Sequence, residues 1–151
     1  MRAVIQRVAA ASVDVEDRRV GEIGNGLLAL IGVGHDDGTA EAQALVDKML
    51  GLRIFPDEDD KMNRSVVDAG GSVLIVSQFT LLADVRKGRR PSFTKAAPPA
   101  KAAALVDEVI ALIAAQGVRA ESGEFGAMMN VELVNSGPVT IVIDVADGKV
   151  Q

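Results

Sequence analysis

Short apolar runs and alternating segments occupy the first third of the chain. Residues 3–8 are rich in β-branched side chains, and residues 12–16 alternate polar and apolar positions with the period of a half-buried strand. Residues 20–23 predict the return strand of a hairpin. A continuous apolar run over 27–33 predicts a central strand, and residues 73–76 predict another buried one.

Two other segments have apolar residues at helical spacing. The first helix is predicted to start within residues 36–39, where Asp36, Asp37 and Thr39 are candidate N-caps. The second is predicted to open at Pro98-Pro99 and to run to about Gln116. Gly117, which follows it, is typical of a helix C-terminus.

Short strands return near the end of the chain. We expect strands over residues 118–121, 130–135 and 139–145, with a turn at Ser136-Gly137-Pro138 between the last two. The pattern totals seven or eight strands and two main helices, with strands grouped at both ends. It therefore predicts one α+β domain over residues 1–151, with mainly antiparallel sheet.

The amino-acid composition excludes several kinds of site and of binding partner. The 151 residues include no Cys and one His, which excludes thiolate chemistry and multi-His metal sites. The net charge of −5 and the absence of Trp and Tyr argue against a general nucleic-acid coat. No apolar run reaches the ~18 residues of a membrane span, and the first residues lack a signal-peptide pattern, so we expect a cytoplasmic protein.

Polar side chains directly follow the predicted strand 73–76: Ser77, Gln78 and Thr80, with Phe79 among them. The end of a buried strand is a common place for functional groups that face a cleft. A hydroxyl nucleophile at Ser77 or Thr80 would need a base, and the neighbouring sequence offers no His or Lys. The pattern also fits a strand that ends in a plain polar loop.

A Gly-Pro step, Gly137-Pro138, follows Asn135 between two predicted strands. Spacing alone is typical of a bare turn, and X-Pro is the only common site of a cis peptide bond. The functional hypothesis is that main-chain oxygens of this step face a ligand amine. Glycine would then be needed because no side chain fits there.

Two further segments allow both a structural and a functional interpretation. Four of the five residues 86–90 are cationic: Arg86, Lys87, Arg89 and Arg90. They form either a solvated loop or a phosphate contact that reads no sequence. Phe125 and Met129 form either ordinary core or an apolar wall for a planar ring.

Taken together, these segments resemble the D-aminoacyl-tRNA deacylase family over nearly the whole chain. The two signature segments are Ser77–Leu81 and Asn135–Thr140. Further family-like stretches are residues 1–8, 55–57, 61–65, 83–84, 87–88, 90–93 and 126–129. One departure is Asp60, where the family pattern has glycine before Lys-Met-Asn.

The resemblance implies barrel-like antiparallel sheets flanked by two helices, in a cytoplasmic homodimer with two active sites at its interface. It implies hydrolysis of the ester between a D-amino acid and the 3′-terminal adenosine of tRNA. Removal of glycine from non-cognate tRNA is also implied, while L-aminoacyl-tRNA is spared. The tRNA and a second copy of the chain are the expected partners, and no metal, other cofactor or membrane is expected.

The resemblance also implies roles for individual residues. The N–H groups of Phe79 and Thr80 would stabilise an oxyanion, with Ser77 and Gln78 holding the terminal nucleotide. Adenine would contact Phe125 and Met129. A cis Gly137-Pro138 pair from the partner subunit, within the signature that includes Asn135, would occupy the space of an L side chain. The phosphate contacts would come from Arg7, Arg86, Lys87, Arg89 and Arg90.

The identity of the nucleophile is a separate question. The resemblance and the missing base favour water activated with help from the 2′-hydroxyl of the terminal ribose, with Thr80 as an orienting group. Two alternatives stay open. One is a hydrolase of another acyl ester or amide with Thr80 as its nucleophile. The other is a non-catalytic nucleic-acid-binding module on the same fold.

Overall fold

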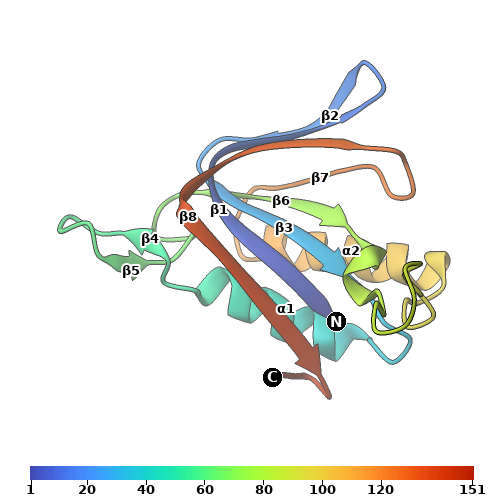
Figure 1. Cartoon of the computed structure of the whole chain (residues 1–151). Helices are drawn as coiled ribbons and strands as arrows, with labels where there is room; N and C mark the ends of the chain where they lie inside the picture. The colour runs from blue at the N-terminus through green and yellow to red at the C-terminus, as the bar shows by residue number, and fades with distance from the viewer.

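A strongly curved sheet with two helices against one face forms the architecture of the computed structural model, which describes residues 1–151 (Figure 1). The helices are α1 (Thr39–Gly51) and α2 (Pro99–Ala115). The strands of the main sheet are β1 (Arg2–Val15), β2 (Arg18–Ile23), β3 (Gly26–Gly32), β6 (Ser72–Ser77), β7 (Ala120–Ser122), β8 (Asn130–Ala146) and β9 (Lys149–Val150). A separate hairpin contains β4 (Phe55–Pro56) and β5 (Met62–Arg64).

The strand order is β7-β6-β3-β1-β8-β9, with β2 also paired to β1. Strand β1 is antiparallel to β2, β3 and β8, whereas β3, β6 and β7 are parallel neighbours. The parallel part follows from connectivity, because α1 lies between β3 and β6 and α2 lies between β6 and β7. The result is the expected barrel-like α+β fold with two helices, built on a mixed sheet. Neither helix has the length and apolar character needed to cross a bilayer.

The two faces of the sheet pack differently. On the helix side, Ile5, Ile31 and Ile75 join a core of 26 buried residues that includes the inner faces of both helices. On the other side, the distal halves of β1 and β8 curl over the sheet, so that Val13 and Val76 share a smaller cluster of seven buried residues. Burial of each such side chain stabilises the fold by about 1.5–3 kcal/mol.

Part of this second face is only partly covered within the chain. Val4 pairs with Leu30 and Val142, and Gln6 pairs with Thr140. Val142 is 60% exposed, and none of the other four is fully buried. We call these five residues the open face. Apolar side chains left uncovered on a sheet are typical of a contact surface.

Three predictions about elements were wrong. The strands expected over 3–8 and 12–16 are one strand, β1, and those expected over 130–135 and 139–145 are one strand, β8. The two long strands pair on both sides of Ser136–Val139, which have no partner on β1, and the register shifts around Val8 at this point. Gly137-Pro138 is therefore a kink inside a strand and not a turn between two.

The third correction concerns the start of α1. The N-cap is Gly38, and no side chain among residues 36–39 caps the helix. Glu41 replaces such a cap, because its carboxylate accepts hydrogen bonds from the N–H groups of Gly38 (2.8 Å) and Gly148 (2.7 Å). The carboxylate of Asp37 instead accepts from the terminal amine of Met1 (2.5 Å) and from Gly34 N–H (2.6 Å).

Candidate active site

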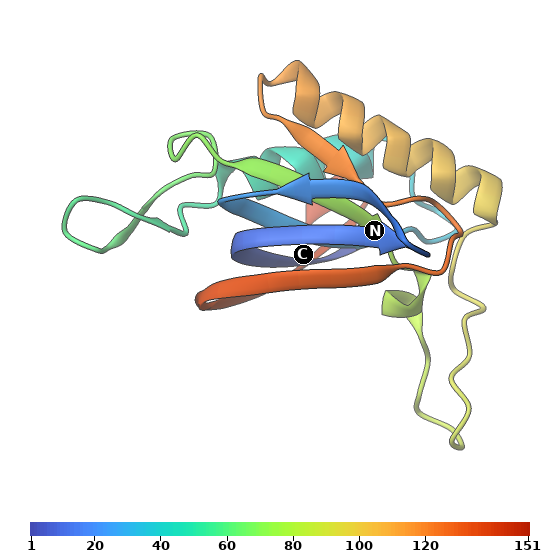
Figure 2. The ribbon, with the colours of Figure 1, turned by 90° about the horizontal axis from the view of Figure 1, so that it is seen from above.

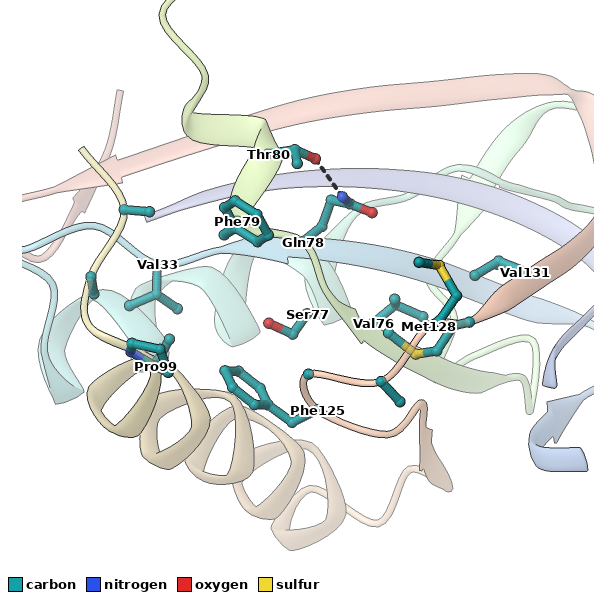
Figure 3. A pocket seen from close by; sticks show the side chains of 16 residues that line it. Val33, Val76, Ser77, Gln78, Phe79, Thr80, Pro99, Phe125, Met128 and Val131 are labelled. Carbon is teal, nitrogen blue, oxygen red and sulfur yellow. Dashed lines mark hydrogen bonds between the residues drawn. The ribbon is translucent and has the colours of Figure 1, made fainter. Parts of the chain in front are cut away.

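A cavity of about 640 Å³ opens at the end of β6 (Figure 3). Its walls come from the strand end, from the following 3₁₀ turn η1 (Phe79–Leu82), from the start of α2 and from the segment before β8. Six of the residues predicted from sequence line it: Ser77, Gln78, Phe79, Thr80, Phe125 and Met129. The Ser77–Thr80 segment and Phe125, which lies 45 residues after Thr80, therefore line one cavity.

The sheet ladder stops where the cavity begins. The N–H of Gln78 still donates to Ile31 O (2.7 Å), and the first bond of the 3₁₀ turn runs from Leu81 N–H to Gln78 O (3.2 Å). The N–H groups of Phe79 and Thr80 fall between these two bonds, so the turn gives them no acceptor. Two adjacent main-chain donors are thus available at the cavity wall.

Thr80 has a partner but no base. Its Oγ1 accepts a hydrogen bond from Nε2 of Gln78 (Figure 3). No ionisable side chain lines the cavity. The one histidine, His35, is engaged elsewhere, since its Nε2 lies 2.9 Å from Thr94 O. A hydroxyl in this setting lacks the proton acceptor that nucleophilic catalysis requires.

The opposite wall is apolar. Phe125 is 41% exposed and Met128 is 90% exposed, although both line the cavity. Figure 3 shows the ring of Phe125 facing Pro99 at the first turn of α2, with Ser77 between Phe125 and Phe79 in this view. Such a wall of ring and thioether groups suits a flat aromatic ligand.

The kink of β8 lies apart from this cavity within one chain. The Gly137-Pro138 peptide bond is cis, and neither residue lines the cavity. Asn135 frames the kink, because its Oδ1 accepts from Val139 N–H (2.7 Å) and its Nδ2 donates to Val139 O (3.1 Å). Asn135 therefore lies away from the cavity as well.

Glycine is required at the kink. Gly137 has a φ of +141°, and a Cβ there would lie 3.0 Å from Nη2 of Arg7. Arg7 in turn donates from Nε to Ser136 O (2.8 Å) and from Nη1 to Ile54 O (2.5 Å). The kink is thus an exposed part of β8 whose shape is fixed by hydrogen bonds with Arg7 and Asn135.

The basic segment forms a projecting loop (Figure 2). Two main-chain hydrogen bonds between Asp84 and Ser92, of 2.8 and 3.0 Å, close its base. Hydrogen bonds from the Arg86 side chain and N–H lower the pKa of Asp84 to about 2. The loop also carries the exposed side chains of Lys87, Arg89 and Arg90. These basic residues lie together, outside the cavity.

Known proteins similar to this chain show which family it belongs to. The family model described as D-Tyr-tRNA(Tyr) deacylase matches residues 4–144. The chain belongs to this family. It is 60% identical to the D-aminoacyl-tRNA deacylase of Koribacter versatilis and 56% identical to that of Thermotoga petrophila, each match covering 95% of this chain and 97% of the relative.

Two solved structures share the deacylase fold. The "c-Myc DNA Unwinding Element Binding Protein" superposes with a TM-score of 0.89 at 38% identity, covering 97% of this chain and 99% of that one. A "probable eukaryotic D-amino acid tRNA deacylase" has a TM-score of 0.82 at 22% identity, covering 95% and 98%.

Part of the cavity lining could not be recognised in the sequence. Ten lining residues were not singled out as site residues: Val33, Val76, Ala96, Ala97, Pro99, Ala102, Gly126, Ala127, Met128 and Val131. They are small or apolar side chains whose only contribution is shape, so no residue type signals them. The helix-opening Pro99 was recognised, but its place at the cavity follows only from the packing of α2 on β6.

Proposed function

We propose that this chain is a D-aminoacyl-tRNA deacylase. It hydrolyses the ester between a D-amino acid and the 3′-terminal adenosine of tRNA, removes glycine from non-cognate tRNA and spares L-aminoacyl-tRNA. The observation that carries this proposal is the Ser77–Thr80 cavity, whose lining holds no ionisable side chain. An aminoacyl ester is already activated, so positioning and oxyanion stabilisation matter more than a strong base.

The substrate fits the cavity in one orientation. Adenine packs on the apolar wall at Phe125 and Met129, and Ser77 and Gln78 hold the terminal nucleotide. The ester carbonyl then lies at the start of η1, near the N–H groups of Phe79 and Thr80. A volume of about 640 Å³ is sufficient for a nucleoside with an attached amino acid.

The chemistry uses the substrate's own hydroxyl. Water attacks the ester carbon and passes a proton to the 2′-hydroxyl, which relays a proton to the leaving 3′ oxygen. The bond between the carbonyl carbon and the 3′ oxygen breaks, releasing the free amino acid and the tRNA 3′-hydroxyl. The N–H groups of Phe79 and Thr80 stabilise the negative charge on the carbonyl oxygen. A tRNA ending in 2′-deoxyadenosine, with the ester on its 3′ oxygen, should then be hydrolysed far more slowly.

In this proposal, a second subunit selects between D- and L-aminoacyl esters. The kink at Gly137-Pro138 is exposed, rigidly held and remote from its own cavity. The open face starts beside the kink, where Thr140 Oγ1 accepts from Asn135 Nδ2, and reaches Leu30, which pairs with the cavity residue Val76. Its Val142 is exposed. A second copy covering this face would bring its kink to the cavity. Main-chain oxygens of Gly137 and Pro138 of the partner subunit would then meet the substrate amine and exclude an L side chain.

Mixed dimers test this arrangement. Gly137→Ala displaces the main-chain oxygens that would hold the substrate amine, and Phe125→Glu damages the cavity wall, so each variant alone should be inactive on D-aminoacyl-tRNA. If the kink acts in trans, mixing the two inactive variants restores one complete site in every mixed dimer. Random reassortment should return about a quarter of the wild-type activity. Action within one chain predicts no restoration.

The tRNA is bound through its acceptor end. The loop residues Arg86, Lys87, Arg89 and Arg90 would contact a few phosphates, which is compatible with an overall charge of −5. We place the protein in the cytoplasm, where its substrate is used. Arg7 was also predicted to contact phosphate, although its guanidinium is hydrogen-bonded to Ser136 and Ile54.

Two alternatives make different predictions. A Thr80 nucleophile would require a base that the cavity does not contain. A non-catalytic nucleic-acid-binding module is suggested by the name of the 38%-identical structural relative. Such a module would bind through the basic loop and would be indifferent to Gly137 and Gln78. Release of D-amino acid above the spontaneous rate separates it from the deacylase.

A further inference from the structure

An aromatic pair connects the cavity to the basic loop. The rings of Phe79 and Phe93 meet edge to face, with centroids 5.0 Å apart and planes at 73°. Phe79 lines the cavity, whereas Phe93 does not. Phe93 follows Ser92, which closes the base of the basic loop. An edge-to-face pair is held by the ring quadrupoles in addition to the buried area.

The main chain around Phe93 is anchored on both sides. Before it, Ser92 exchanges two hydrogen bonds with Asp84 (2.8 and 3.0 Å). After it, Ala97 N–H donates to Val33 O (2.9 Å), and Thr94 O lies 2.9 Å from Nε2 of His35. Phe93 is therefore presented from a segment fixed to the end of β3.

Phe79 is less restrained. It opens a 3₁₀ turn of only four residues, and 53% of its surface is exposed. Rotation of the Phe79 backbone would redirect its own N–H and that of Thr80. The ring of Phe93 is the one aromatic contact that opposes such a rotation.

We propose that Phe93 is a positioning residue for the hydrolysis: it holds Phe79 in place and, through it, the two main-chain donors at the cavity. This inference rests on the proposed function. It also gives the basic loop a second role, because phosphate contacts that fix the loop would steady Phe93 as well.

The test compares Phe93→Leu with Phe93→Tyr, which keeps the ring. Val85→Ala is the matched control, since it trims an exposed apolar side chain of the same loop. Turnover is measured on D-aminoacyl-tRNA and on adenosine carrying the same D-amino acid on its 3′ oxygen. For Phe93→Leu we expect kcat to fall about tenfold on both substrates with KM changed less than about twofold. Phe93→Tyr should recover kcat to within about twofold, and Val85→Ala should match the wild type.

A purely structural role for Phe93 gives other results. Wild-type kcat in Phe93→Leu would overturn the inference, and so would a loss that Phe93→Tyr does not recover. A loss confined to KM on the tRNA substrate would overturn it too, because that result assigns Phe93 to tRNA binding alone. The thermal midpoint of each variant shows whether a loss reflects unfolding. Absence of wild-type turnover would contradict the proposed function itself, and the inference with it.

Discussion

Nε of Arg7 donates a hydrogen bond to the main-chain oxygen of Ser136, one residue before the cis Gly137-Pro138 bond, at 2.8 Å. The same guanidinium donates to Ile54 O, so it joins the kink of β8 to the segment after α1. Asn135 frames the kink from within the strand. The kink is thereby shaped before any partner or substrate arrives, which reduces the cost of ordering it on binding.

Arg7→Ala should damage the kink more than the affinity for tRNA. Without its two donors, the Gly137-Pro138 step becomes mobile and excludes an L side chain less well. We expect the ratio of D-ester to L-ester hydrolysis to fall at least about tenfold, which corresponds to a reduction in discrimination of ~1.4 kcal/mol. Deacylation of D- and L-aminoacyl-tRNA by wild type and variant measures it. A weaker Kd for tRNA with an unchanged ratio would instead support the predicted phosphate contact.

Thr80→Val removes the hydroxyl and keeps the N–H. Because the proposed mechanism uses the main-chain donor, turnover on D-aminoacyl-tRNA should fall no more than about tenfold. Thr80→Ser is the control, since it restores a hydroxyl that can accept from Gln78. Loss of activity by several orders of magnitude in Thr80→Val, with full activity in Thr80→Ser, would establish Thr80 as the nucleophile.

The base of the basic loop should respond to acid. The pKa of Asp84 is lowered from 3.8 to about 2, mainly by the side-chain hydrogen bonds of Arg86. A lowered pKa in the folded state means that the carboxylate stabilises the loop above its ordinary pKa and loses this effect as the pH falls through about 2. The stabilisation of the loop base by the Asp84 carboxylate should therefore be constant around neutral pH and should weaken between about pH 4 and pH 2.

Carbon NMR of the Asp84 carboxyl group measures this titration. Arg86→Ala should raise the pKa of Asp84 toward its ordinary value. Asp57 serves as an internal control, because its pKa is lowered mainly by a hydrogen bond from Asn63 in the β4–β5 hairpin. A wild-type Asp84 that titrates at its ordinary value would show that the pair with Arg86 is not formed in solution.

The exposed arginines at the loop tip should account for the salt dependence of tRNA binding. Replacing Arg89 and Arg90 together by Ala should lower the slope of log Kd against log salt by ~0.7–0.9 for each phosphate that these side chains neutralise in the wild type. Lys149→Ala is the matched control, since Lys149 is exposed at the far end of the chain. Hydrolysis of the aminoacyl adenosine should not change. An equal effect of Lys149→Ala would mean that charge acts only at long range.

Most helices and strands could be predicted from the sequence because each depends on the pattern of apolar residues within its own segment. Apolar runs located β3 and β6, and helical spacing with Pro98-Pro99 located α2. Asp60, noted as a departure where the family pattern has glycine, adopts a φ of +60°. This φ lies in the left-handed region, which glycine adopts without steric cost and which Asp adopts more readily than most other residues. The departure thus preserves the backbone shape of the loop.

Longer-range relationships could not be predicted in this way. Periodicity cannot show that β1 and β8 bend together, because the bend resides in the register of their pairing. It also could not show that Asn135 bonds to its own strand, or that Arg7 crosses to Ser136. The aromatic pair of Phe79 and Phe93 depends on how the basic loop closes. Each of these features comes from tertiary contacts between segments whose sequences do not indicate that they lie together.

The most direct test of the account is a deacylation time course on D-tyrosyl-tRNA and L-tyrosyl-tRNA with the same enzyme preparation. The account predicts rapid loss of the D-ester, with the L-ester decaying at its spontaneous rate. Spontaneous decay of both esters would contradict the deacylase function. Equal enzymatic cleavage of both would contradict exclusion by Gly137-Pro138 and would favour a hydrolase without chiral selection.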